Sequence, residues 1–143
     1  MIIRDQDNQI ELDLVEVDGP PAGDGDGHFH VKVSAHGFSG ENYVWVEAFI
    51  FHTFVDELQK LANTRSGSAQ LESMNPHELR LMVRVLEKTS EIAVEGELRR
   101  NVVLQSRRQR VENRLVFALT LDENGISETL RYLRQIKAQF PLP

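Results

Sequence analysis

Apolar and polar residues alternate along much of the chain, and this period of two predicts β-strands with one buried face and one solvated face. The alternating stretches are residues 9–17, 28–36, 42–48, 68–73, 78–87, 91–99 and 114–122. The positions expected to face inward are Ile10, Leu12, Leu14, Phe29, Val31, Val33, Ala35, Leu79, Leu81, Val83, Val85, Ile92, Val94, Leu98, Leu115, Phe117, Leu119 and Leu121. Glycine and proline in residues 19–27, and "GFSG" at 37–40, are typical of a loop and a turn between the first strands.

Two stretches follow the helical period instead, at residues 50–64 and 126–140, and the second ends before Pro141. In the first stretch the apolar residues recur at intervals of three and four, which places them on one helical face. They are Phe51, Phe54, Val55, Leu58, Leu61 and Ala62. Asp56 and Lys60 are one turn apart on the polar side, so we expect them to pair.

The order of elements is strands, helix, strands, helix. Only "KTS" separates residues 78–87 from 91–99, which predicts a hairpin, and most other links are too short for parallel crossovers. The sequence therefore predicts a single α+β domain over residues 1–143, with a mainly antiparallel sheet and two amphipathic helices packed on it. The similar apolar spacing of 54–61 and 126–133 is what any two strand–helix units would show, and it leaves internal duplication open.

Composition is typical of a globular protein, with 143 residues, 41% hydrophobic and 27% charged. The chain has no cysteine, which excludes disulfides, thiolate metal sites and thiol nucleophiles. The sequence "MIIRDQDNQI" is charged and lacks the apolar run of a signal peptide. The chain has no run of about 18 apolar residues, so the sequence predicts no membrane-spanning helix. We therefore expect a cytoplasmic protein.

The formal charge of −6 is unevenly distributed: residues 1–27 hold eight acids and Arg4, whereas residues 99–114 hold six arginines and Glu112. "NVVLQ" within the arginine segment has enough β-propensity to extend the hairpin. Arginines could grip nucleic-acid phosphates, but the negative total charge and the lack of interleaved aromatic residues argue against nucleic acid as a partner. A solvated edge, or a contact with the acidic segment within one chain or in a homodimer, is favoured.

"GDGDGHFHVKV" at 23–33 could be a metal site, because His28 and His30 would lie about 6.6 Å apart on one strand face. His36 would be about 20 Å farther along, so only Asp24 or Asp26 from the loop could join them. "DGDG" is also shorter than a twelve-residue calcium loop and lacks its closing glutamate. We expect solvent-facing histidines and no bound metal.

No sequence motif indicates catalysis or a cofactor. The chain has no "GxSxG" elbow, and no glycine-rich loop leads into a helix to hold phosphate. Glu95 and Glu97 could line a cleft with Arg80 and Arg84, but pairing between the outward faces of the two hairpin strands is favoured.

Protein binding is the function that the remaining surface residues favour. Glu11 and Asp13 project from the wet face of one strand, and the loop aspartates lie beside the next. Tyr43 and Trp45 share one strand face; we favour a core position, and outward orientation would make them anchors for a protein partner. The candidate partner-binding residues are Glu11, Asp13, Asp24, Asp26, Tyr43 and Trp45.

Four segments together resemble the WapI-type bacterial immunity proteins, from about residue 9 to residue 137. The segments are "GFSGENYVWVEAFIFHTFVDELQKL", "GSAQL", "ELRLMVRVLEKTSEIAVEGEL" and "RLVFALTLDENGISETLRYLRQI". The likeness lies in the order and spacing of apolar positions, in "GSAQL" after the first helix, and in Asp122 before the last helix. "NVVLQSRRQRVEN" departs from the pattern.

This resemblance implies a small cytoplasmic α+β protein that binds and neutralises a toxin domain, often a nuclease, and has no catalytic motif. An acidic domain suits a basic nuclease, because carboxylates can stand where phosphates would lie and can speed association. Two alternatives stay open: a non-enzymatic interaction domain of another role, including a homodimer, and a small metal-dependent or hydrolytic enzyme.

Overall fold

The computed structural model describes residues 2–19, 25–106, 109–140 and 142. The predicted α+β class is confirmed, and both helices and all seven predicted strands are present. The elements are β1 Ile2–Asp5, β2 Asn8–Val17, β3 Gly27–Ala35, β4 Phe38–Val46, α1 Ala48–Thr64, β5 Ser68–Glu72, β6 Leu79–Val85, β7 Ile92–Leu104, β8 Gln109–Leu121 and α2 Glu123–Gln139. β1 was not expected, because four residues are too few to show a period.

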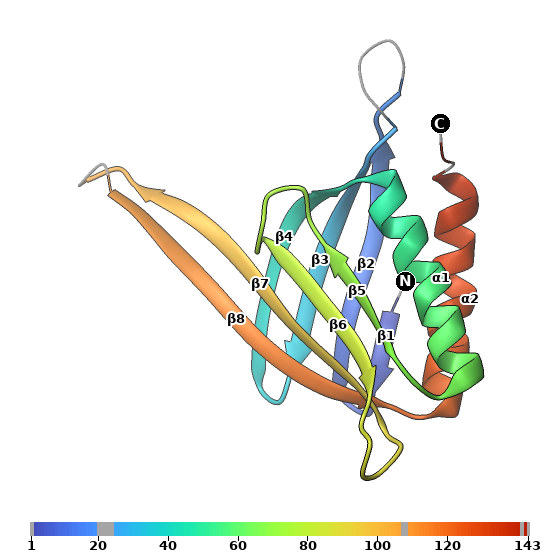
Figure 1. The fold of residues 1–143 in the computed structure, drawn as a ribbon. Helices are drawn as coiled ribbons and strands as arrows, with labels where there is room; N and C mark the ends of the chain where they lie inside the picture. The colour runs from blue at the N-terminus through green and yellow to red at the C-terminus, as the bar shows by residue number, and fades with distance from the viewer. Residues whose placement is uncertain (1, 20–24, 107–108, 141, 143) are drawn as a thin grey trace.

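The strands form two antiparallel sheets of four, β1-β2-β3-β4 and β5-β6-β7-β8, where the sequence suggested one. The strand pairs all join neighbours in the chain, and α1 lies between the fourth strand and the fifth. Local alternation predicts strands but does not reveal which strands pair, so the division into two sheets was not visible. Each half of the chain thus consists of four strands followed by a helix (Figure 1).

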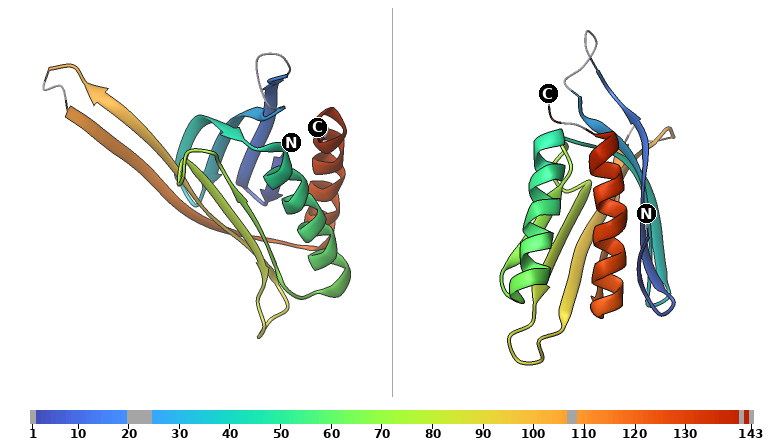
Figure 2. Two further views of the ribbon diagram at one scale, coloured as in Figure 1. Left: turned by 45° about the horizontal axis from the view of Figure 1, so that its top comes forward. Right: turned by 90° about the vertical axis from the view of Figure 1, so that its right-hand side faces the viewer.

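The inner faces of the two sheets and the two helices share one apolar core. On one side of the molecule, β4 of the first sheet contacts β7 and β8 of the second (Figures 1 and 2). On the other side, α1 packs on β5, α2 packs on β1, and the two helices pack on each other. The inward strand positions are confirmed, since Leu14, Val85 and Leu115 are partly buried against this core and the others are fully buried.

Both helices begin a few residues earlier than predicted. The carboxylate of Asp122 accepts a hydrogen bond from the backbone N–H of Gly125 at 2.7 Å, which caps α2. The predicted Asp56–Lys60 pair is wrong. Asp56 instead pairs with Lys137 at 2.6 Å, because α2 runs alongside α1 and brings this lysine against it.

A glycine in the second sheet makes room for an aromatic ring. Gly96 on β7 lies opposite Phe117 on β8, at a position that faces the core. A Cβ atom at residue 96 would lie 2.4 Å from Cζ of Phe117, so any side chain there would displace the ring. The glycine therefore serves packing, as glycines beside cross-strand aromatic residues do.

The β7–β8 hairpin continues beyond the body of the molecule. β7 and β8 pair from Ile92 opposite Leu121 to Leu104 opposite Gln109, whereas β6 pairs with β7 only as far as Leu98. The outer part, residues 99–104 and 109–114, is called the arm here. It projects as a two-stranded ribbon (Figures 1 and 2). The predicted extension of the hairpin is confirmed.

Candidate functional site

The solvated side of the first sheet, called the outer face here, gathers most of the predicted partner-binding residues. Side chains alternate along each strand, so those between the buried positions of β2, β3 and β4 point to this side. A register shift between Leu14 and Glu16 adds Glu16 to it, opposite His28. The outer-face residues used below are Glu11, Asp13, Glu16, His28, His30, Lys32, Glu41, Tyr43 and Trp45.

Two histidines stack on two aromatic rings across β3 and β4. His28 lies opposite Trp45, with ring centroids 4.5 Å apart and planes 7° from parallel. His30 lies opposite Tyr43, with centroids 4.3 Å apart and planes at 4°. The ring of His28 also contacts that of Tyr43 at 5.7 Å, which joins the four rings into one cluster. Stacking favours the observed rotamers of the four side chains, since aromatic pairs of this kind contribute about 0.5–1.5 kcal/mol.

Each histidine also lies beside a carboxylate. Nε2 of His30 is 3.0 Å from Oε2 of Glu41 in hydrogen-bond geometry. Nδ1 of His28 is 3.4 Å from Oε1 of Glu16 without such geometry, so this buried nitrogen has no hydrogen-bond partner among the described residues. As expected, both histidines point to the solvated side of β3. Stacking and the neighbouring carboxylates leave their side chains only 23% and 19% exposed.

The imidazoles contact separate carboxylates and do not converge on one point. Within the described ranges, no three histidine, aspartate or glutamate side chains are placed to hold a metal ion. His36 lies exposed at the β3–β4 turn. Asp24 lies outside the described residues, and the absence of metal stays a prediction.

The preference for a core position of Tyr43 and Trp45 was wrong. Val44 and Val46 occupy the buried positions of β4, which leaves residues 43 and 45 on the outer face, with Tyr43 54% exposed and Trp45 half-buried. β4 is held to the second half on this stretch, because the backbone N–H of Met74 donates to the carbonyl of Trp45 at 2.8 Å. The two rings therefore lie on a fixed strand.

Asp26 does not join the outer face. Its carboxylate accepts a hydrogen bond from the backbone N–H of Ala48, the first residue of α1, at 3.3 Å. Its own N–H donates to the side chain of Asp18. Glu47, directly before α1, makes no capping hydrogen bond, so Asp26 satisfies the helix end from 22 residues away. We interpret Asp26 as a structural residue.

A two-residue turn is the sequence signal that could have revealed the stacked rings. His36 and Gly37 both have positive φ, 51° and 85°, and they place Ala35 opposite Phe38. This is the geometry of a tight hairpin turn. Counting back from that pair places His30 opposite Tyr43 and His28 opposite Trp45. The turn expected at 37–40 would have given a different register, because Phe38 already belongs to β4.

The outer face has more negative than positive groups. Glu11, Asp13, Glu16 and Glu41 are the acidic residues of this face on β2 and β4, and its basic residues are Lys32 on β3 and the exposed Arg4 on β1. An open depression of about 440 Å³ lies beside them, lined by Gln9, Glu11, Lys32, Val33, Ser34, Ser39, Gly40 and Glu41. Aromatic rings with a charged rim are typical of a protein-docking surface.

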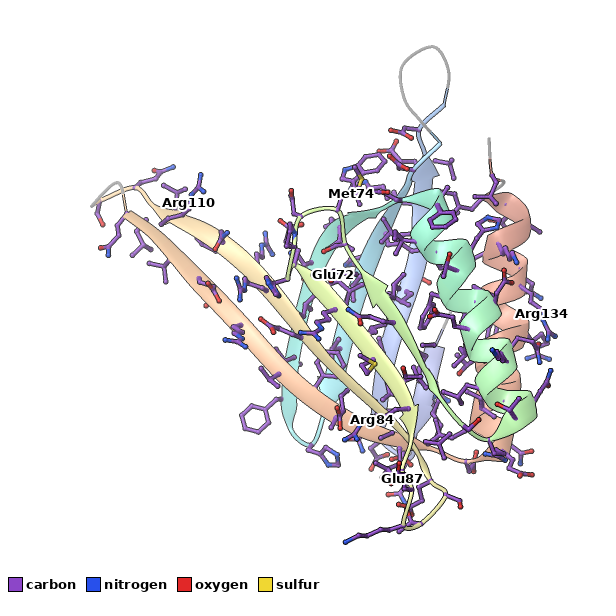
Figure 3. All side chains as sticks on the ribbon, viewed as in Figure 1. Glu72, Met74, Arg84, Glu87, Arg110 and Arg134 are labelled. Atoms are coloured by element: carbon purple, nitrogen blue, oxygen red, sulfur yellow. The ribbon has the colours of Figure 1, made fainter. Side chains whose placement is uncertain are left out.

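The outer side of the second sheet is different, because its charges pair with each other. Arg84 contacts Glu95 at 2.8 Å across the hairpin, and this hydrogen bond and charge raise the pKa of Arg84 above its ordinary value. Glu97 pairs instead with Arg99 and Arg114, so the predicted pairing between the outward arginines and glutamates of the two hairpin strands is confirmed only for Arg84 and Glu95. Figure 3 shows Arg84 at one end of this sheet and Arg110 near the other.

Comparison with known proteins gives one match. The chain matches the model of the immunity protein WapI-like family over residues 1–141. No curated protein and no solved structure matches it. The helices in the described part of the chain are too short or too polar to span a membrane.

Proposed function

Because the chain belongs to the WapI-like family of immunity proteins, we propose that it binds a cognate toxin domain and neutralises it by protein–protein contact, without catalysis, in the cytoplasm of the toxin-producing cell. The outer face is the proposed docking surface. One observation carries this choice: four carboxylates and two aromatic rings from β2 and β4 gather on one face of the first sheet. The proposed partner is a basic toxin domain, such as a nuclease.

The rings suit an interface because their conformations are fixed before binding. Tyr43 and Trp45 are each stacked on a histidine, so docking would cost them little rotamer entropy. Tyrosine and tryptophan also dominate the residues that contribute most to binding energy in known interfaces. We therefore assign the rings to the stability of the complex, which is measured by its dissociation rate.

The carboxylates suit a different role. Glu11 and Asp13 lie on an exposed strand, where their individual ion pairs with a partner would be screened by water and salt. Their summed field still attracts a basic domain from a distance of about a Debye length, 8 Å at physiological salt. We assign them to the rate of association.

Association rates with a purified toxin domain, identified by pull-down with this chain from its native cell, test the proposal. Reversing two face charges, Glu11→Lys with Asp13→Lys, should slow association about tenfold at low salt and less at high salt. The control reverses two helix charges, Glu57→Lys with Glu128→Lys, which are exposed on α1 and α2. An equal effect of both double variants, or none from the face variant, would reject the outer face as the docking surface.

A further inference from the structure

The arm lacks the support that other parts of the sheets have. At its base the arm still contacts β4, where the side-chain amide of Asn42 donates to the carbonyl of Arg99 at 2.8 Å. Farther out, no third strand among the described residues pairs with it, and a two-stranded ribbon by itself is marginally stable in water. Yet it exposes apolar side chains on both faces: Val102, Val103, Leu104 and Val111. Val103 is 58% exposed. A ribbon of this kind is stabilised when a partner covers it.

Charge limits what that partner can be. Six arginines and one glutamate give residues 99–114 a formal charge of +5. Since the whole chain has a formal charge of −6, the rest of the chain has a charge of −11. Glu97 and Glu112 neutralise Arg99 and Arg114, with contacts of 2.8 to 3.1 Å. Within the described part of the chain, Arg100 and Arg110 have no ion-pair partner. An acidic surface is favoured, and pairing of two arms would bring like charges together.

We propose that the arm docks on the outer face of a second copy of this chain, in a two-fold dimer. That face supplies what the arm needs: the carboxylates of Glu11 and Asp13 for the free guanidinium groups, and the rings of Tyr43 and Trp45 for apolar and cation–π contact. The arm passes the β4 edge of its own first sheet and ends beside that sheet, not over it (Figures 1 and 2). Only the base of the arm lies beside its own outer face, where Arg100 and Glu41 line one groove, and the outer part of the arm projects away from the first sheet (Figure 1).

A groove at the base of the arm continues this surface. It encloses about 510 Å³ between the start of β4 and the arm, and its lining includes Phe38, Arg100 and Val102. Phe38 is 69% exposed there. In a two-fold dimer each chain contributes both an arm and a face, so two identical contacts form.

The dimer would use the face that the proposed function assigns to the toxin. A basic toxin would then displace the partner's arm, and the two complexes would exclude each other. The dimer can be measured without toxin, so its absence would leave the proposed function untouched, and failure of toxin binding would leave the dimer untouched.

Sedimentation equilibrium of the full chain at micromolar concentration, in low and high salt, measures the dimer. The arm variant is Arg100→Glu with Arg110→Glu, the face variant is Glu11→Lys with Asp13→Lys, and the matched control is Arg131→Glu with Arg134→Glu on exposed positions of α2. The structure predicts a salt-sensitive dimer for the natural chain and the control. Each of the other two variants should weaken self-association about 100-fold or more. Circular dichroism melting confirms that each variant folds.

Mixing the arm and face variants gives the decisive result. One contact of the mixed dimer then joins a reversed arm to a reversed face, and the other joins the two natural surfaces, so a heterodimer should form from two monomeric proteins. A monomeric natural chain would overturn the proposal. A dimer that persists in the arm variant would also overturn it. A mixture of the two variants that stays monomeric would overturn it as well, because the arm would then pair with a different surface.

Discussion

The two halves of the chain share an order of elements, but their outer sheet faces differ in chemistry. On the second sheet arginine and glutamate side chains pair with each other, as Arg84 does with Glu95. On the first sheet, Glu16 and Glu41 contact histidines, which carry no charge when deprotonated. The shared topology sets which positions face water, and the residues at those positions decide what each face can bind.

The halves also differ at the edge where they meet. In the first sheet β2, β3 and β4 are nearly equal in length, whereas the β7–β8 hairpin of the second sheet extends six residues past the last residue of β7 that β6 pairs with. The first half therefore offers a broad fixed face, and the second half offers a projecting ribbon. These are complementary shapes as well as opposite charges, and this is why we assign them to each other in the dimer.

The largest effect should come from breaking the core that both halves share. Phe54→Ala in the first half should lower the free energy of unfolding by about 3–5 kcal/mol, and Leu81→Ala in the second by about 2–5 kcal/mol, because both side chains are fully buried. Urea unfolding followed by Trp45 fluorescence and by far-UV circular dichroism measures both. Since one core joins the halves, the two signals should change together in each variant. If Leu81→Ala shifted only the circular dichroism transition, the halves would be independent.

Replacing one glycine in each sheet should change the free energy of unfolding by smaller amounts, and by different amounts in the two sheets. Gly96→Ala should cost about 1–3 kcal/mol of unfolding free energy, because its Cβ would overlap the ring of Phe117. Gly40→Ala on β4 should be nearly neutral, since the nearest atom would be 3.4 Å away on the side chain of Leu115. Chemical denaturation of both variants checks this. Equal losses at the two positions would show that backbone freedom, not packing, requires glycine.

The smallest expected effects concern the starts of the two helices. Asp122 caps α2 from the adjacent position, whereas Asp26 holds the first N–H of α1 from a distant loop. Replacing either by alanine should cost about 0.5–2 kcal/mol, as capping residues do. Thermal or urea unfolding measures the loss. A loss for Asp122→Ala with none for Asp26→Ala would show that the distant contact does not stabilise α1.

The sequence predicts those parts of the fold that depend on local burial. The spacing of apolar residues predicts the strands and helices, because each element has a single buried face. Phe29 and Val31, two residues apart on β3, are an example. β1, the division into two sheets and the Asp56–Lys137 pair depend on contacts between distant segments, which local patterns do not record.

The candidate site shows the same limit. The alternation of side chains along a strand is enough to place Glu11 and Asp13 on its solvated face, and the structure confirms this. The same alternation places Tyr43 and Trp45 on one face of their strand. A core position was nevertheless favoured for them, because large aromatic residues are usually buried. The stacking on His28 and His30 further required the register of β3 with β4, which the turn at His36 and Gly37 determines. The contact of Asp26 with the start of α1 could not be predicted either, because the two are 22 residues apart in the sequence.

The central claim is that the outer face docks the toxin, and Trp45 tests it most directly. It is the chain's single tryptophan and lies on that face. Incorporating 5-fluorotryptophan into this chain alone gives one fluorine resonance at the proposed interface. Titration with the toxin domain identified by pull-down from the native cell should shift or broaden this resonance, with saturation at one toxin per chain. If the toxin binds by calorimetry while the resonance stays unchanged, the toxin docks elsewhere and the claim is wrong.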